Sequence, residues 1–214
     1  PKTIDLIAYA WGSQSNSLHW HVPDSHWPRM PYAAPIAELR AAAAGIPVMA
    51  LGRIVDPNEA EAVLAAGQAD LVGIGRAIIT DPAWTRKALG GQGYAIRPCV
   101  SGNSCWGSVA TPSALACDNN PALATREEID GVPALNEGLR RVVVVGCGVA
   151  GLEVAWVAAA RGHDVTLFGA SGELGGRARL AAALPGGEGL AGVYDFQVAE
   201  SRARGVRIEL GIQA

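Results

Sequence analysis

The sequence predicts an α/β protein in which the C-terminal part of a (β/α)8 TIM barrel is followed by the start of a Rossmann-like domain. Residues 1–92 repeat a short apolar run, a loop and a helical stretch three times. Apolar strands that alternate with helices are typical of a parallel sheet with covered faces. Further along, a β-branched strand runs through a glycine-rich turn into an Ala-rich helix, which is how Rossmann-like domains begin.

The barrel portion is expected to hold three strand–helix units. We expect strands at residues 4–7, 47–51 and 70–74, and helices at residues 32–40, 58–64 and 82–89. Asp56 and Asp81 each precede a proline and are expected to cap the two later helices. Three units are too few to close a barrel. We therefore expect strands upstream of Pro1, and we do not expect this piece to fold alone.

The pattern divides the chain into three parts: barrel units at 1–92, a junction at 93–138 and a second domain at 139–214. The junction is rich in Pro, Ser, Asn and Gly, so we expect a metal or a partner domain to order it. In the second domain we expect strands at 140–145, 164–168 and 206–210. The first helix of that domain is expected to end at Gly162. The last strand has nothing after it to pack on, so this end also looks cut.

Composition excludes several classes of protein. The net charge of the 214 residues is −3 and the pI is about 5.8, and no basic stripe for nucleic acid is present. No apolar run reaches the roughly 18–20 residues that a membrane span needs. Four cysteines without a secretory signal favour metal or redox chemistry over disulfides, and they indicate a cytoplasmic protein.

Two glycine–arginine pairs, Gly52–Arg53 and Gly75–Arg76, follow the second and third expected strands. Barrel sites lie at the C-terminal ends of strands, and the last loops commonly hold a phosphate. Glycine lets the anion approach the backbone, and arginine supplies charged donors. The pattern predicts a phosphate site, and the alternative is that both arginines pair with surface carboxylates.

The glycine-rich turn fits a dinucleotide fingerprint, because it directly follows a strand and opens a helix. Gly146 makes the tight turn, Gly148 admits a pyrophosphate and Gly151 lets the helix pack on the strand. The alternative is a tight turn without a ligand. An acidic residue for the ribose is expected at the end of the next strand, where Gly169 stands instead and Glu173 is out of register.

Three cysteines, Cys99, Cys105 and Cys117, lie in the junction. Thiolates gathered in an irregular loop suit a soft metal or an iron–sulfur cluster. Three thiolates are one short of the full set for a 4Fe–4S cluster or a structural zinc, and unrelated buried thiols are the alternative.

A loop after the first strand carries three histidines and the tryptophans Trp20 and Trp27. Its histidine spacing fits no helix face, which disfavours a metal site. Together with Trp11, the tryptophans are candidates to line a substrate pocket, to stack on a flavin or to hold a cationic amine. The alternative is that they anchor the loop to the barrel rim.

Taken in order, these pieces resemble the long form of the NADH:flavin oxidoreductase family, which includes 2,4-dienoyl-CoA reductase and trimethylamine or dimethylamine dehydrogenase. The motifs that carry the resemblance extend over essentially the whole chain: 22–25, 51–57, 73–82, 96–99, 117–121, 146–151, 174–176 and 184–186.

The resemblance implies FMN held near Arg53, Gly75 and Arg76, and a 4Fe–4S cluster at the junction. It also implies FAD or ADP in the second domain, around the residues Gly146, Gly148, Ala150, Gly151 and Arg177. Relatives place a cysteine where Gly102 stands. This departure leaves either a three-thiolate cluster with another fourth ligand or the loss of the cluster. The proton-transfer residues of the family sit on earlier strands, so no catalytic residue is assigned here.

The resemblance also implies an FMN-dependent enzyme that passes electrons between its substrate, the flavin, the cluster and the second nucleotide site. The spacing of Cys99 and Cys105 and the Trp-rich loop favour an amine dehydrogenase or demethylase. The alternative is an NAD(P)H-dependent dienoyl-CoA or enoate reductase, and a different class is an electron-relay module without its own activity. The expected partners are a small amine or enoyl substrate and either NAD(P)H or an electron-transfer protein. A homo-oligomeric assembly is left open.

Overall fold

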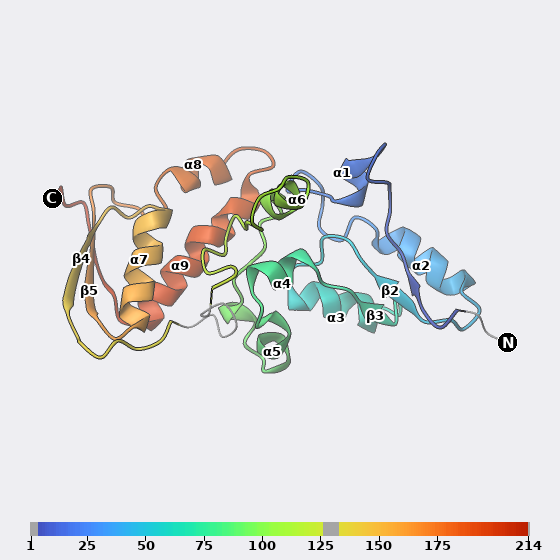
Figure 1. Ribbon diagram of the computed structural model, residues 1–214, viewed down its shortest axis with the longest axis horizontal. Helices are drawn as coiled ribbons and strands as arrows, with labels where there is room; N and C mark the ends of the chain where they lie inside the picture. Colours follow the sequence, from blue (N-terminus) through green and yellow to red (C-terminus); the bar gives the residue numbers. More distant parts are fainter. Residues whose placement is uncertain (1–3, 126–132, 214) are drawn as a thin grey trace.

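The computed structural model describes residues 4–125 and 133–213, so part of the expected junction, residues 126–132, lies outside the described residues. The chain is elongated, with one α/β unit at each end and an irregular segment between them (Figure 1). The two parallel sheets confirm the predicted α/β class. None of the helices in the described ranges is long and apolar enough to cross a bilayer.

The first sheet has three parallel strands in the order β1 (Ile7–Ala8), β2 (Val48–Ala50) and β3 (Leu71–Val72). Ile7 pairs with Val48, and Met49 pairs with Leu71. The strands are shorter than the apolar runs predicted. The helices of this half, in chain order, are α1 (Leu18–His21), α2 (Ala33–Ala42), α3 (Pro57–Ala65), α4 (Arg76–Thr80) and α5 (Trp84–Leu89).

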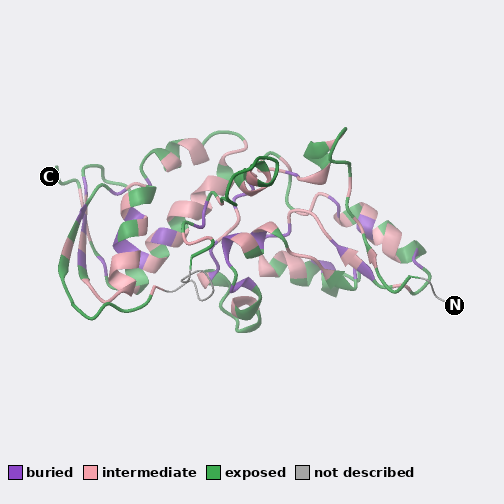
Figure 2. Ribbon diagram, viewed as in Figure 1, coloured by how far each residue is buried: buried purple, intermediate pink, exposed green. Residues whose placement is uncertain are grey.

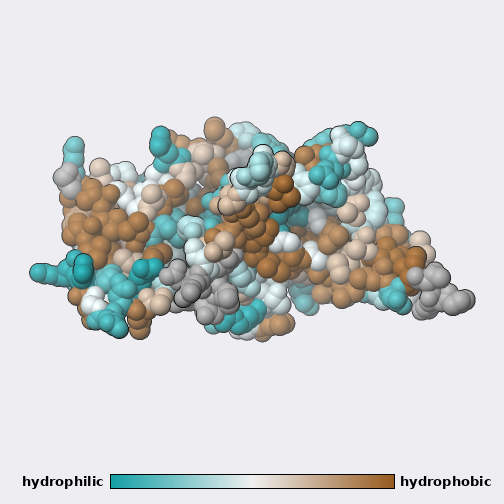
Figure 3. Space-filling model, viewed as in Figure 1, coloured by the Kyte–Doolittle hydropathy of each residue, from teal (hydrophilic) through white to brown (hydrophobic). Residues whose placement is uncertain are grey.

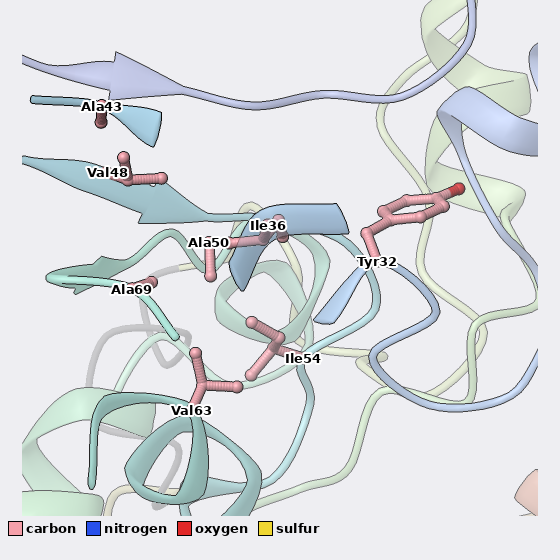
Figure 4. Close-up of a cluster of buried hydrophobic side chains, with 8 residues drawn as sticks. All are labelled: Tyr32, Ile36, Ala43, Val48, Ala50, Ile54, Val63 and Ala69. Atoms are coloured by element: carbon pink, nitrogen blue, oxygen red, sulfur yellow. The ribbon is translucent and has the colours of Figure 1, made fainter. Parts of the chain in front are cut away.

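A small hydrophobic core joins this sheet to α2 and α3. Ile36 of α2 and Val48 of β2 are almost fully buried, and Val63 of α3 packs into the same cluster. Figure 4 shows these side chains pointing toward one another between the helices and the strands. Burying each such side chain stabilises the fold by about 1.5–3 kcal/mol, which fixes the strand ends from which the site loops depart.

The two predicted aspartate caps behave differently. Asp56 accepts a hydrogen bond from the Asn58 N–H at 2.7 Å, and Glu59 completes a capping box, so α3 begins where the sequence predicted. The prediction for Asp81 is wrong, because α5 begins only at Trp84. Asp81 Oδ1 still accepts from the Ala83 N–H at 3.0 Å, just before this helix, while Oδ2 accepts from Lys87 Nζ at 2.6 Å and from the Arg97 N–H at 2.9 Å.

The second sheet is parallel in the order β4 (Arg141–Val145), β5 (Asp164–Gly169) and β6 (Arg207–Leu210). Helices α7 (Val149–Ala160) and α9 (Ala191–Ala203) pack together, and α7 also contacts β4 and β5. Buried Leu152 of α7 meets Val165 and Leu167 of β5 in the core of this half. Two further elements, α8 (Arg177–Ala182) and the 3-10 turn η3 (Glu188–Leu190), precede α9.

The side chains of β4 that point away from this core are exposed. Val143 and Val145 keep 65% and 67% of their surface accessible. Figure 2 shows the buried residues on the α7 side and the exposed ones along the outer strand. Hydrophobic atoms gather over β4, β5 and α7 at the left of the surface (Figure 3).

The junction contains two short helical elements, the 3-10 turn η1 (Gly93–Ala95) and α6 (Ser104–Val109), which the sequence analysis did not predict. Residues 96–103 and 110–125 have no regular helix or strand. Asparagine amides hold part of this segment, since Asn119 donates to the Pro98 carbonyl and Asn120 to the Ile79 carbonyl, each at 2.9 Å. The irregular backbone is therefore tied to α4 through side chains.

Asp70 fastens the start of β3 to β2, and this contact yields a test. Its carboxylate accepts from the Val48 N–H at 2.8 Å and pairs with Arg40 Nε at 2.6 Å. The bond from Val48, followed by the contact with Arg40, lowers the pKa of Asp70 against the opposing effect of desolvation. A lowered folded-state pKa stabilises the fold above the unfolded-state pKa of about 3.9, and this stability is lost as pH falls through the folded value.

We therefore expect Asp70→Asn to lower the melting temperature of the intact protein at pH 7. The difference from the wild type should shrink as the pH falls through the folded-state pKa of Asp70. Glu61→Gln, at an exposed position of α3, is the control and should melt like the wild type. Equal melting temperatures for the wild type and Asp70→Asn at pH 7 would contradict this role.

Candidate functional site

Two arginines at neighbouring strand ends line the same pocket. Arg53 follows β2, and Arg76 is the first residue of α4, which follows β3. Both line a pocket of about 280 Å³, together with Gly52 and Gly75. Adjacent strand–helix loops thus bring together the residues for which the sequence analysis expected phosphate binding.

The charges in this pocket repel one another. Burial lowers the pKa of Arg53, the guanidinium groups of Arg29 and Arg76 lower it further, and Asp24 acts in the opposite direction. The Nε of Arg53 donates to the hydroxyl oxygen of Ser101 at 3.3 Å, which is a neutral acceptor. Crowded cations destabilise each other's charged forms, so an anion between them would be favoured.

Arg76 is held in position by oxygen acceptors from two other segments. Its Nη1 donates to the Pro23 carbonyl at 2.8 Å and to Asn103 Oδ1. Asn103 in turn donates to the Val22 carbonyl at 3.0 Å. The loop after β1 and the cysteine-bearing loop therefore both orient this guanidinium.

Neither Arg53 nor Arg76 forms an ion pair with a carboxylate within residues 4–125 and 133–213. The alternative interpretation, in which both arginines pair with surface carboxylates, therefore finds no support in this part of the chain.

Backbone geometry keeps the pocket open at its glycines. Gly52 has a φ of +110°, and a Cβ there would lie 2.4 Å from the ring of Tyr32, so no side chain is tolerated. Arg53 itself has a φ of +49°, a left-handed value that is uncommon for a residue with a side chain. A Cβ on Gly75 would meet nothing, so an anion has access to the backbone there.

The glycine-rich turn of the second domain has the geometry of a dinucleotide-binding turn. Gly146 has a φ of +106°, and a Cβ on Gly151 would lie 1.8 Å from the Gly146 carbonyl oxygen. Both positions therefore require glycine for the turn and for helix packing. Gly148 precedes α7, and a Cβ on it or on Gly146 would meet nothing. Ala150 is exposed beside them.

The end of β5 lacks an acidic side chain. A Cβ on Gly169 would lie 2.5 Å from Cys147 Sγ, so the thiol fills that space. Cys147 donates to the Glu173 carbonyl at 3.3 Å, while the Glu173 carboxylate pairs with Arg179 at 2.9 Å. Arg177, the first residue of α8, is exposed. Among the described residues, β5 therefore ends in Gly169 and offers no carboxylate of its own where a ribose hydroxyl is expected.

The three junction cysteines, Cys99, Cys105 and Cys117, line one small pocket, together with Gly102. Burial raises the pKa of Cys105, and the neighbouring Cys99 and Cys117 also raise it. The pocket volume is about 10 Å³, the space of roughly one water. Within the described ranges, no three His, Cys, Asp or Glu side chains converge closely enough to ligate a single ion.

The aromatic residues after β1 pack on one another. Trp20 and Trp27 have ring centroids 4.7 Å apart, and Trp11 stacks between Trp20 and Tyr32 at 5.8 and 5.9 Å. The Tyr32 hydroxyl donates to the Trp20 carbonyl. This mutual stacking favours the interpretation of these side chains as loop anchors.

The three histidines of this loop have separate partners. The Nδ1 of His21 lies 3.3 Å from the Trp11 carbonyl oxygen, and that of His26 lies 3.2 Å from Asp24 Oδ1. The ring of His19 stacks near Trp27. No metal site forms from them in the described structure.

Arg97, which the sequence analysis did not single out, joins the two halves of the chain. Its guanidinium binds both oxygens of Glu153 in α7, at 2.8 and 3.3 Å, and the Asn119 carbonyl at 2.8 Å. It also lies 4.6 Å from the ring centroid of Phe196 and 5.4 Å from that of Trp156. The guanidinium of Arg97 is therefore almost enclosed by groups of the second domain and by the Asn119 carbonyl of the junction.

Other missed residues lie in the cysteine loop. Ser101 and Asn103 contact the two arginines, and the Asp118 carboxylate lies against Gly102. The local signal was weak, because serine, asparagine and aspartate are ordinary in loops. Ser101 and Asn103 have left-handed backbones, with φ of +56° and +65°. The sequence gives no sign of this conformation, which only the structure shows.

Comparisons with known proteins match each half of the chain to a different family. Residues 5–92 match the NADH:flavin oxidoreductase / NADH oxidase family, and residues 144–213 match the NAD(P)-binding Rossmann-like domain. The chain is 39% identical over 171 residues to an NADH oxidase of Thermoanaerobacter brockii, with 79% of this chain and 26% of that protein covered.

A second relative is an N,N-dimethylglycine/sarcosine dehydrogenase of Chromohalobacter salexigens, 37% identical over 203 residues, covering 93% of this chain and 29% of that protein. Among solved structures, a complex of 2-naphthoyl-CoA reductase superposes with a TM-score of 0.89 at 26% identity, covering 99% of this chain and 32% of that one. The chain thus spans between about a quarter and a third of the length of these relatives.

The enclosure of Arg97 gives a second test. Arg97→Ala would leave Glu153 partly buried without its cation, which typically costs about 3–5 kcal/mol. We expect a lower melting temperature of the intact protein and faster proteolysis between the two domains. Arg202→Ala, at an exposed position of α9, is the matched control. A wild-type melting curve and wild-type proteolysis for Arg97→Ala would show that the contact does not hold the domains together.

Proposed function

Because the chain belongs to the NADH:flavin oxidoreductase / NADH oxidase family, we propose that it serves an FMN-dependent oxidoreductase whose flavin phosphate is bound by Arg53 and Arg76. The observation that carries this proposal is the convergence of both arginines, with Gly52 and Gly75, on one pocket. Bound FMN would supply the chemistry of accepting and releasing electrons, and the protein would supply binding and orientation.

The charge balance of the pocket supports this assignment. Burial, and after it the neighbouring guanidinium groups, lower the pKa of Arg53, and no carboxylate pairs with either arginine in the described ranges. Arg76 keeps a fixed direction through Pro23 and Asn103. A phosphate would relieve the repulsion and accept charged hydrogen bonds from both arginines.

We also propose that the second domain binds the diphosphate of FAD or ADP around Gly146, Gly148, Ala150 and Gly151, with Arg177 nearby. The open backbone at Gly146 and Gly148 supports this. Because β5 ends in Gly169 without an acidic side chain, we propose that the ribose is held by groups other than a carboxylate at this position.

The proposed substrate is an amine, in a dehydrogenase or demethylase reaction. The support is the dehydrogenase of dimethylglycine and sarcosine, whose similarity to this chain covers 93% of this chain and 29% of that protein. An NAD(P)H-dependent reductase of enoyl thioesters is the second candidate, and the fit to 2-naphthoyl-CoA reductase favours it. The four free cysteines fit a cytoplasmic enzyme.

The phosphate assignment is tested by Arg53→Ala combined with Arg76→Ala in the full-length enzyme. Two charged hydrogen bonds, worth about 1.5–3 kcal/mol each, would be lost, so the FMN dissociation constant should rise by about 100-fold or more. Flavin fluorescence after gel filtration measures the release. Arg207→Ala on β6 is the control. Full FMN retention in the double variant would refute the assignment.

The substrate class is tested by stopped-flow spectroscopy of the full-length enzyme. Secondary or tertiary amines should bleach the flavin absorbance without added NAD(P)H. If amines leave the absorbance unchanged while an α,β-unsaturated thioester speeds the oxidation of NAD(P)H, the reductase candidate replaces the amine candidate.

A further inference from the structure

The pocket that contains the two arginines also has an apolar wall, which comes from the junction. Besides the arginines and their glycines, the pocket is lined by Trp106 and Val109 of α6 and by Leu115 of the loop after it. Val109 and Leu115 are large apolar side chains that remain exposed. One pocket therefore combines guanidinium groups at two strand ends with apolar side chains from a later part of the chain.

Hydrogen bonds fasten the start of α6 to both arginines. Asn103 directly precedes α6, and its side chain accepts from Arg76 Nη1 while it donates to the Val22 carbonyl. Ser101, two residues earlier, accepts from Arg53 Nε at 3.3 Å. The segment that leads into α6 thus holds both guanidinium groups, so the charged and apolar sides of the pocket have fixed positions relative to each other.

Trp106 is positioned at the pocket by a second aromatic ring. Its ring and that of His21, the last residue of α1, have centroids 6.1 Å apart and planes at 71°, an edge-to-face arrangement that aromatic pairs favour. His21 lines the same pocket, and its Nδ1 lies 3.3 Å from the Trp11 carbonyl oxygen. Trp106 is only half-buried, so part of its indole surface is accessible to a ligand.

We propose that Trp106 is a flavin-binding residue, and that it forms, with Val109 and Leu115, the wall against which the isoalloxazine ring of FMN packs. This inference rests on the proposed function, since it assumes that the two arginines bind the FMN phosphate. FMN has the same two kinds of surface as the pocket, a negatively charged phosphate and a flat, largely apolar ring. Ligand sites typically combine an apolar lining with a few placed polar groups. The junction thus binds the cofactor together with the barrel loops.

A purely structural role is the competing explanation, in which Trp106 only supports Arg76 through Asn103. Three probes separate the two explanations: FMN itself, riboflavin, which lacks the phosphate, and inorganic phosphate, which lacks the ring. A residue that packs on the ring contributes to the binding of FMN and riboflavin but not of phosphate. A residue that only orients an arginine contributes to the binding of FMN and phosphate but not of riboflavin.

The experiment measures the dissociation constants of the three probes for the flavin-free form of the full-length enzyme. We expect Trp106→Ala to raise those of FMN and riboflavin by about 10-fold or more, because stacking on an aromatic side chain contributes this much to the binding of flat rings. Its phosphate affinity should be unchanged, which also shows that the arginine side of the pocket is folded. Trp106→Phe, which keeps an aromatic ring, should recover most of the loss.

Two further variants complete the comparison. Arg53→Ala combined with Arg76→Ala should show the opposite pattern, with weaker binding of FMN and phosphate and little change for riboflavin. Trp27→Ala is the matched control, because Trp27 is also half-buried and stacks near a histidine, His19, but does not line the pocket. It should bind all three probes like the wild type.

Three outcomes overturn the inference and leave the flavin proposal standing. Wild-type affinity of Trp106→Ala for FMN and riboflavin means that no ring packs on Trp106. Weaker phosphate binding with unchanged riboflavin binding means that Trp106 acts only through the arginines. An equal loss in Trp27→Ala and Trp106→Ala means that both changes disturb the loop after β1. Wild-type enzyme that binds neither FMN nor riboflavin refutes the proposed function itself.

Discussion

The buried charge of Arg97 is the interaction on which the arrangement of the whole chain depends. A guanidinium can be enclosed only if anions and hydrogen-bond acceptors surround it, and these come from Glu153 in α7 and from Asn119 in the junction. The Arg97 N–H also donates to Asp81 at 2.9 Å. Arg97 thus connects three parts of the chain: its guanidinium binds the second domain and the junction, and its backbone N–H binds Asp81 of the barrel units.

The position of Arg97 in the chain links this contact to the cysteine loop. Arg97 lies two residues before Cys99, so the anchor of the domains is also the start of the cysteine loop. Gln197 of α9 donates to Glu153 at 2.7 Å and so brings a second helix into the same contact. The spacing between the anion pocket and the glycine-rich turn is therefore set by packed, hydrogen-bonded groups and not by a free linker.

Local chemistry made the architecture predictable from the sequence. The alternation of apolar runs with helices gave the parallel sheets, and Asp56 with Pro57 marked a helix start where the structure has one. The same reasoning placed the next helix too early: Asp81 Oδ1 accepts from the Ala83 N–H, but α5 begins only at Trp84, and Oδ2 is bound by Lys87 and by the Arg97 N–H. Propensity describes a residue and its neighbours, whereas these partners are set by the tertiary fold.

The candidate site was also predictable only in part. Arg53, Arg76 and the glycines before them could be found because the C-terminal ends of parallel strands meet at one edge of a sheet. Residues that directly follow neighbouring strands are therefore expected to lie close together. The contacts of Ser101, Asn103 and Asp118 could not, since they depend on a loop conformation stabilised by residues far along the chain. Arg97 and Glu153 are 56 positions apart in the chain, and no periodic pattern in the sequence indicates that they pair.

The alternation within the cysteine loop has a thermodynamic consequence. Ser101 and Asn103 touch the two arginines, while Cys99 and Cys105 on either side line the thiol pocket. A ligand that stiffens the loop from one side lowers the entropy that the other side must lose. Any ligand that binds at one pocket and orders this loop would therefore change the affinity of the other pocket, and the coupling would be reciprocal.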